Sequence, residues 1–217
     1  MTLEEYLDNV IMLKNDLNDS GHNREHVNYV RRRSKKFASS IEGINMDMVD
    51  TIAVFHDVGH SIDAKNHEKV SAVILASDEH LKEFFSDDEI RIMAEAVEDH
   101  RASKESTPRS VYGLIVSSAD RNTSVEQVIK RTYSYRLKHM PEASIDEIIE
   151  GSRRHAIEKF GVSGYATDKM YFRDEEYEIF LKDIQELSSN PEEFRRRFIE
   201  VNGIDMGRVR KIKEPLN

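Results

Sequence analysis

The 217-residue sequence contains no cysteine, and it has only 4 prolines and 9 glycines. The absence of cysteine excludes disulfides, thiol nucleophiles and metal sites that need sulfur ligands, such as zinc ribbons and iron–sulfur clusters. The low proline and glycine content excludes a collagen-like or low-complexity chain. No apolar run approaches the roughly 20 residues that cross a bilayer, and the acidic N-terminal segment lacks the basic and apolar regions of a secretory signal. We therefore expect a cytoplasmic protein with no membrane-spanning segment.

Acidic residues outnumber basic ones, 41 against 32, which gives a net charge of −9. Such a charge opposes broad binding to nucleic acid or to anionic membranes. Two basic runs, at residues 31–36 and 195–197, have no interleaved aromatic residues that could stack on bases. We interpret both runs as solvated helix faces, and nucleic acid is not an expected partner.

The spacing of apolar residues is helical, and no stretch of six or more residues alternates as a half-buried strand does. Start and stop signals agree with this spacing, with Pro108 before one expected helix and Pro141 after another. The expected helices cover residues 3–17, 24–40, 45–59, 67–77, 87–99, 110–120, 124–139, 144–160, 174–187 and 191–201. The sequence thus predicts an all-α protein, with a helical domain over residues 1–140 and a C-terminal helical extension, residues 141–217, packed on the same core.

Histidines are concentrated in one part of the chain, with seven of the nine between residues 22 and 100. His56 and Asp57 are adjacent inside an apolar helical segment, where a polar side chain is costly unless it is paired or bound to a metal. His26 lies one expected helix earlier. Asp120 ends a later helix, and the small residues at 117–119 let that helix approach a packed site closely.

These four side chains offer two imidazoles and two carboxylates. This mixed nitrogen and oxygen set suits a divalent ion such as Mn, Fe, Co, Ni, Mg or Zn. Four protein ligands on a six-coordinate ion leave two positions for water and a phosphate oxygen, which is the arrangement that metal-assisted hydrolysis needs. The predicted metal ligands are therefore His26, His56, Asp57 and Asp120.

The order His, His-Asp and Asp on successive helices resembles the HD-domain superfamily of metal-dependent phosphohydrolases. The matching segments are residues 25–30 (EHVNYV), 55–60 (FHDVGH) and 117–121 (SSADR), and the resemblance extends over residues 20–130. It implies an HD-domain helical bundle, a metal ion at the four residues above, and hydrolysis of phosphate esters or anhydrides, with nucleotides as the commonest substrates. Because members act on many substrates, the resemblance does not name one.

The resemblance also implies roles for histidines near the four ligands. His60 stands where many members carry Glu or Lys near the metal, so we expect it to act as a general acid or base, with Asp57 as a second proton acceptor. The alternative is an ordinary histidine at a helix end. His67 and His100 resemble the additional histidines with which some members hold a second ion. They could instead line the pocket, bind phosphate or cap helices, so one or two ions per chain are both open.

Three basic residues are candidates for contacts with a substrate phosphate, because their cationic groups match phosphate oxygens. They are Arg101, Arg121 and Lys65. Arg121 directly follows Asp120 and is also expected to neutralise charge in the transition state. The predicted catalytic residues are then Asp57, His60 and Arg121. Ordinary ion pairing is the alternative for each basic residue, and His22 is expected to be a solvated residue at a helix start.

The predicted function is that of a metal-dependent phosphohydrolase, acting on a phosphate ester or anhydride of a small metabolite, with a nucleotide as the expected substrate. One alternative is an HD-type nuclease or cyclic-nucleotide phosphodiesterase. Another is a non-catalytic ligand sensor that retains its metal. The substrate, the metal, the oligomeric state and the role of the C-terminal extension remain open.

Overall fold

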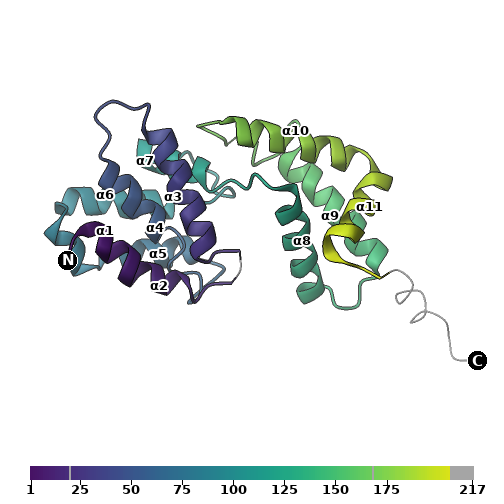
Figure 1. Cartoon of the computed structure of the whole chain (residues 1–217), viewed down its shortest axis with the longest axis horizontal. Helices are drawn as coiled ribbons and strands as arrows, with labels where there is room; N and C mark the ends of the chain where they lie inside the picture. The colour runs from purple at the N-terminus through teal and green to yellow at the C-terminus, as the bar shows by residue number, and fades with distance from the viewer. Residues whose placement is uncertain (20, 168, 206–217) are drawn as a thin grey trace, which may run out of the picture. The chain divides into compact units, whose positions relative to one another are not determined.

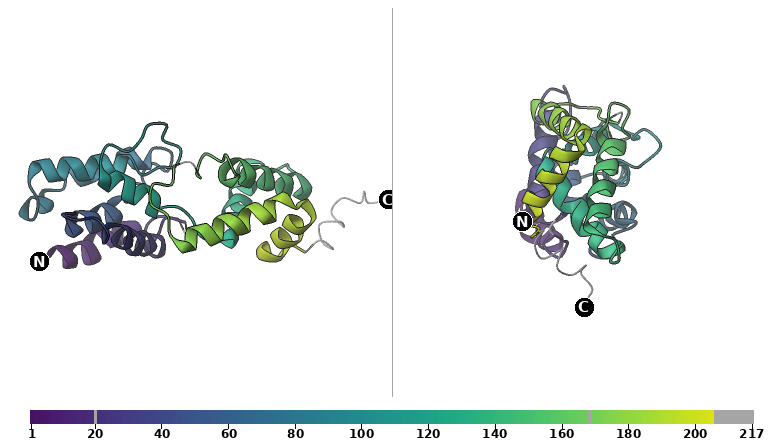
Figure 2. Two further views of the ribbon diagram at one scale, coloured as in Figure 1. Left: turned by 90° about the horizontal axis from the view of Figure 1, so that it is seen from above. Right: turned by 90° about the vertical axis from the view of Figure 1, so that its right-hand side faces the viewer.

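A computed structural model describes residues 1–19, 21–167 and 169–205 (Figures 1 and 2). All regular structure in these ranges is helical, which confirms the predicted all-α fold. The chain forms two compact units, the first made of residues 1–121 and 169–173 and the second of the remaining residues. None of the helices in the described ranges is long and apolar enough to cross a membrane.

The first unit is built around one central helix. Its elements are α1 (Leu3–Tyr6), the π-helical turn η1 (Leu7–Ile11), α2 (Met12–Asn15), α3 (Arg24–Ala38), α4 (Met46–Phe55), α5 (His67–Ala76), the 3-10 helix η2 (Glu79–Glu83), α6 (Asp87–Glu98) and α7 (Val111–Ala119). The central helix, α4, packs against α3, α6 and α7, and α5 packs against α6. Every residue from Met48 to Phe55 is buried, as expected for a helix with neighbours on several sides.

Capping residues set most of the helix starts. Asn45, rather than Asp47, caps α4, because its side chain accepts hydrogen bonds from the N–H groups of Asp47 and Met48. Two short elements, η1 and η2, are absent from the predicted pattern. Apolar spacing shows that a segment is helical, but it does not reveal a change in hydrogen-bond register within a single turn.

The predicted end of the third helix is wrong. The helix was expected to reach residue 59, but α4 ends at Phe55 and residues 56–62 form turns. The N–H of His60 donates to the carbonyl of Asp57, three residues earlier. The N–H of Gly59 donates to Ser71 Oγ in α5 at 2.9 Å, instead of to a carbonyl of its own helix. His56 and Asp57 therefore lie at a helix end and in the following turn, not inside a helix.

The second unit contains α8 (Val125–His139), α9 (Ile145–Phe160), α10 (Glu175–Ser189) and α11 (Pro191–Asn202). Its core includes Phe160, Tyr177, Phe180, Phe194 and Phe198, all nearly inaccessible to solvent. The division between the units falls after residue 121, earlier than the expected boundary at 140, because α8 packs against α9 and α11. The expected packing of the C-terminal part on the same core stays a prediction, and its last residues, 206–217, lie outside the described residues.

A short segment from late in the sequence, residues 169–173, belongs to the first unit. The N–H groups of Tyr171 and Phe172 both donate to Ser118 Oγ in α7, each at 3.1 Å. The ring of Phe172 stacks on Phe37 in α3, with 5.7 Å between ring centroids. One buried hydroxyl therefore holds a segment that is about fifty residues away in sequence.

Replacing Ser118 with alanine is expected to destabilise the first unit by about 1–3 kcal/mol, because two backbone donors lose their acceptor. Ser39→Ala is the matched control, since the Ser39 hydroxyl is exposed and donates only to a carbonyl in its own helix. The control should remain within about 0.5 kcal/mol of the parent protein. Urea unfolding of both variants measures the difference, and equal free energies of unfolding would show that the Ser118 contacts do not stabilise the fold.

Candidate metal centre

The four predicted ligands come together in the first unit. His26 lies in the first turn of α3, His56 and Asp57 follow α4, and Asp120 follows α7. His26 Nε2 lies 3.4 Å from Asp57 Oδ2 and 3.0 Å from Asp120 Oδ1. His56 Nε2 lies 3.1 Å from Asp57 Oδ2 and 3.2 Å from His26 Nε2. We call these four residues the first cluster.

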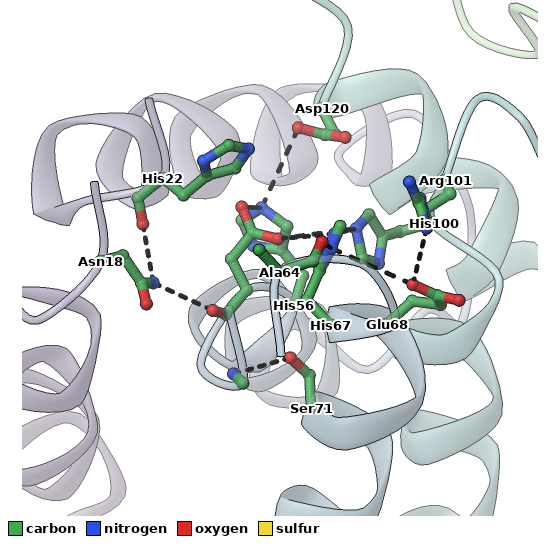
Figure 3. A network of polar contacts seen from close by, with 12 residues as sticks. Asn18, His22, His56, Ala64, His67, Glu68, Ser71, His100, Arg101 and Asp120 are labelled. Carbon is green, nitrogen blue, oxygen red and sulfur yellow. Dashed lines mark hydrogen bonds and ion pairs between the residues drawn. The ribbon is translucent and has the colours of Figure 1, made fainter. Parts of the chain in front are cut away.

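Two further histidines, His67 and His100, which are labelled in Figure 3, face the other carboxylate oxygen of Asp57. His67 begins α5, and His100 lies just after the end of α6. Their Nε2 atoms lie 3.3 and 3.6 Å from Asp57 Oδ1 and 3.2 Å from each other. We call Asp57, His67 and His100 the second cluster, and the Asp57 carboxylate is common to both clusters.

Backbone carbonyls fix the orientation of three imidazole rings. The Nδ1 atoms of His56, His67 and His100 lie 2.7, 3.1 and 2.6 Å from the carbonyl oxygen three residues earlier. Because a carbonyl can only accept, each Nδ1 must carry the hydrogen, and the neutral ring then presents an Nε2 lone pair to its cluster. This is the second hydrogen bond that metal-ligating histidines usually make.

The donor set of the second cluster fits a cation. Asp57 Oδ1 is buried and accepts no hydrogen bond from the described residues. Its neighbours in this cluster, Nε2 of His67 and Nε2 of His100, are themselves acceptors in the tautomer that the backbone carbonyls select. A buried acceptor without a donor costs about 1–3 kcal/mol, which a bound cation would remove. The C-terminal ends of α4 and α6 bring partial negative charge to this cluster, and the N-terminal end of α5, at His67, brings partial positive charge.

The protonation of the two clusters differs. Burial would lower the pKa of His26, but hydrogen bonds and charge from Asp120 and Asp57 raise it to about 9. Burial lowers the pKa of His100 to about 4. Burial opposes the charge of Asp57, yet the charge of His56 and a hydrogen bond from His26 hold the pKa of its carboxyl well below the usual range. Burial also opposes the charge of His56, but the charge of Asp57 and a hydrogen bond to it raise the pKa of this ring. At neutral pH, without a metal, the first cluster therefore favours protonated imidazole, on His26 above all, whereas His100 is neutral.

The turn that carries Asp57 is held by residues that sequence reasoning missed. The Asn18 amide donates to the carbonyls of Asp57, at 2.9 Å, and His22, at 3.0 Å (Figure 3). Gly59 lies so close to α5 that an added Cβ would sit 2.7 Å from Val70 Cγ1 and 2.8 Å from a backbone nitrogen. Only glycine fits this approach without displacing the backbone. The sequence does not reveal the Asn18 contact, because the segment at residues 18–21 (NDSG) has the composition of an ordinary helix end.

His60 lies at the rim of the clusters. Its ring stacks on His22 with 3.8 Å between centroids, and it lies 5.3 Å from the ring of His67. The Nδ1 of His22 contacts Asp19 Oδ1 at 2.7 Å. In the described part of the chain, three groups of side chains are close enough to hold an ion: Asp19, His22 and His60; the first-cluster residues His26, His56 and Asp57; and the second cluster. Asp120 meets the first-cluster residues through His26, at 3.0 Å. The expectation that His22 is merely solvated misses this stacking, and the acid–base role of His60 stays a prediction.

Arg101 connects the segments that carry the two histidines of the second cluster. Its Nη1 donates to Glu68 Oε2 at 3.1 Å (Figure 3). The same nitrogen donates to the carbonyl of Lys65 at 2.7 Å. Its side chain is 36% exposed, so it remains accessible to a ligand. The residue Lys65 is also exposed. The contact with Glu68 was not predicted, and the phosphate-binding roles of Arg101 and Lys65 stay predictions.

Arg121 is placed differently from the other basic candidates. It is only 3% exposed, and its Nη2 donates to Ser117 Oγ at 3.0 Å. Its backbone carbonyl accepts a hydrogen bond from the Tyr29 hydroxyl at 2.8 Å. This placement favours support of the turn after α7 over direct contact with a substrate, and its catalytic and substrate-binding roles remain untested predictions.

Residues of both basic runs pair with acidic residues of the chain. In the first run, Arg31 and Lys35 both pair with Asp50. The arginines at 195–197 pair with acidic residues of the second unit, namely Asp146, Glu193, Glu200 and Glu126. This pairing agrees with the absence of nucleic acid from the expected partners, which stays a prediction.

Comparison with known protein families gives one finding. Residues 23–123 match the family model described as the HD domain. The matched range contains both clusters and leaves out α8–α11. Comparisons with curated proteins and with solved structures give no significant match.

The metal-free protein is expected to lose stability as the pH rises from about 6.5 to about 9. Folding raises the pKa of His26 from 6.5 to about 9, so its contribution is complete below pH 6.5 and disappears as the pH passes 9. A metal ion competes with the same proton, so stabilisation by Mn²⁺ should grow over this range. Thermal unfolding with EDTA or with excess Mn²⁺ measures both trends.

The His26→Gln variant is the control for this pH dependence, because it lacks the titrating ring. Its metal-free melting temperature should vary less between pH 6.5 and 9 than that of the parent protein. A parent melting temperature that stays constant across this range would contradict the assignment of the proton to His26.

Proposed function

We propose that this chain, which matches the HD-domain family model over residues 23–123, is a metal-dependent phosphohydrolase of that superfamily, acting on a small phosphorylated metabolite, with a nucleotide as the expected substrate. The family as a whole supports metal-dependent phosphate chemistry, and the substrate class is our inference. The observation that carries the proposal is the buried Asp57 carboxylate, whose two oxygens face two separate sets of imidazole nitrogens.

We assign one divalent ion to the first cluster and a second ion to the second cluster, with Asp57 common to both. The nitrogen and oxygen donors suit Mn, Fe, Co, Ni, Mg or Zn. Ions bound there would supply Lewis-acid activation of a phosphoryl oxygen and of the attacking water. The carbonyl-bound Nδ1 atoms keep three histidines in the tautomer that ligates through Nε2.

The rim residues then handle substrate and protons. Arg101 uses Nη1 for its bonds to Lys65 and Glu68, so the guanidinium is already oriented when a phosphate arrives. His60 is partly exposed and stacked on His22, and its ring lies 5.3 Å from the ring of His67 in the second cluster. From there it would give a proton to the leaving oxygen or accept one from water. The positions of His60 and Arg101 support a reaction at the solvent-accessible edge of the two clusters.

One observation favours a second candidate function. The second cluster gives this chain the ligands for two ions, and paired ions suit cleavage of phosphodiesters as well as of terminal phosphates. A cyclic-nucleotide phosphodiesterase or a nuclease would use the same residues. A substrate panel that contains mononucleotides, cyclic nucleotides and short single-stranded oligonucleotides separates the three.

Asp57→Ala is expected to abolish both metal retention and phosphate release. The variant removes a ligand common to both ions, so activity should fall by more than the roughly 10–100-fold that follows loss of a supporting residue. Elemental analysis and a phosphate-release assay with Mn, Co, Ni and Mg measure the two effects. Asp47→Ala, an exposed change in the first turn of α4, is the matched control and should behave like the parent protein. Full activity of Asp57→Ala would overturn the proposed function.

A further inference from the structure

One face of α3 contacts both the Asp120 carboxylate and the backbone on either side of Asp120. His26, Tyr29 and Arg33 are spaced at i, i+3 and i+7, so they lie along the same side of the helix. His26 contacts Asp120 directly, whereas Tyr29 and Arg33 contact the backbone around Asp120. Helix α3 therefore carries the predicted ligand His26. It also carries Tyr29 and Arg33, which bind the backbone of the turn that contains the predicted ligand Asp120.

Arg33 is a fully buried cation, with 0% exposure. Its Nη1 donates to the carbonyls of Ala119 at 3.0 Å and Arg121 at 2.9 Å, the two residues that flank Asp120. The same Nη1 lies 3.4 Å from the carbonyl of Ser118 and 3.1 Å from the Tyr29 hydroxyl, so its two hydrogens are shared among four acceptors. That hydroxyl in turn donates to the carbonyl of Arg121 at 2.8 Å.

These contacts have a clear electrostatic basis. The last carbonyls of a helix have no partner within it, and the C-terminal end carries a partial negative charge. Arg33 satisfies such carbonyls at the end of α7 with a positive charge. Burial of a guanidinium is costly unless its donors are bonded, so these carbonyls stabilise the buried cation, and the cation in turn stabilises the helix end. The position of the Asp120 backbone is thereby tied to α3.

We propose that Arg33, with Tyr29, is a positioning residue that sets the place of the Asp120 carboxylate relative to His26 and so determines the affinity of the first cluster for its ion. The inference rests on the proposed function, in which Asp120 and His26 ligate that ion. Arg33 is shielded from solvent, and the hydrogen bonds given above join it to the turn after α7. We expect its effect on the ion to pass through that turn.

The test measures Mn²⁺ affinity by electron paramagnetic resonance in the full-length chain, with Arg33→Met and Arg33→Lys. Removal of a supporting partner typically costs about 10–100-fold in metal affinity, and that loss is expected for Arg33→Met. Arg33→Lys keeps the charge but has fewer donors, so a smaller loss is expected. The loss of Mn²⁺ affinity should affect binding at the first cluster. Binding at the second cluster, which contains His67 and His100, should remain unchanged.

Arg31→Met is the matched control. Arg31 lies on the same helix and donates to Asp50 at 2.8 and 2.6 Å, so its loss should lower the melting temperature. It has no contact with the turn after α7 among those described, and its Mn²⁺ affinity should match that of the parent protein. Equal weakening in Arg31→Met and Arg33→Met, or equal weakening of both binding events, would overturn the proposal, because either result indicates a general loss of structure.

Two further variants keep the result decisive. If Arg33→Met does not fold, Tyr29→Phe removes only the hydroxyl that donates to Arg121, and a several-fold loss at the same binding event is expected. Unchanged affinity in a folded Tyr29→Phe and Arg33→Lys would overturn the proposal. Asp120→Asn separates the two inferences: if it keeps the parent affinity, the ligand assignment itself fails, whereas if it loses affinity and the Arg33 variants do not, only the positioning role fails.

Discussion

The buried carboxylate of Asp57 is the group on which the rest of the site depends. The residue is 1% exposed, and its two oxygens contact imidazoles that come from four different segments. Burial of an unpaired carboxylate is strongly unfavourable, so the fold must supply positive charge there. In the metal-free chain the histidines of the first cluster share that role through protons. Divalent ions would satisfy both oxygens at once, including Oδ1, which accepts no hydrogen bond from the part of the chain that the structure describes.

The fold surrounds this carboxylate with the ends of several helices, and the other predicted ligands lie at or next to those ends. Apolar packing around α4 fixes the helices, and their termini then place the ligands in turns instead of within regular helix. The turn after α4 is possible because Gly59 approaches α5 closely and because Asn18 holds the carbonyl of Asp57. Arg33 performs the equivalent task for the turn that carries Asp120. Precise ligand placement thus depends on backbone hydrogen bonds as much as on the ligands.

Much of this was predictable from the sequence, and the failures have physical causes. Helical spacing and capping residues located most helices within a few residues, and the order of His26, His56, Asp57 and Asp120 identified the family. Spacing could not show that α4 stops at Phe55, because the bond from Gly59 to Ser71 joins residues twelve positions apart. The same limit concealed the stacking of His22 on His60 and the burial of Arg121, which both depend on tertiary contacts.

The boundary between the two units also depends on tertiary packing, since α8 reads as a continuation of the first unit until its contacts with α9 and α11 are known. The central claim, however, concerns only the first unit. A crystal of the protein grown with Mn²⁺ and measured at a wavelength where manganese scatters anomalously tests it most directly. We predict two anomalous peaks on opposite sides of the Asp57 carboxylate, each within about 2.0–2.3 Å of histidine Nε2 atoms. A structure with Mn²⁺ bound elsewhere, and none at Asp57, would contradict it.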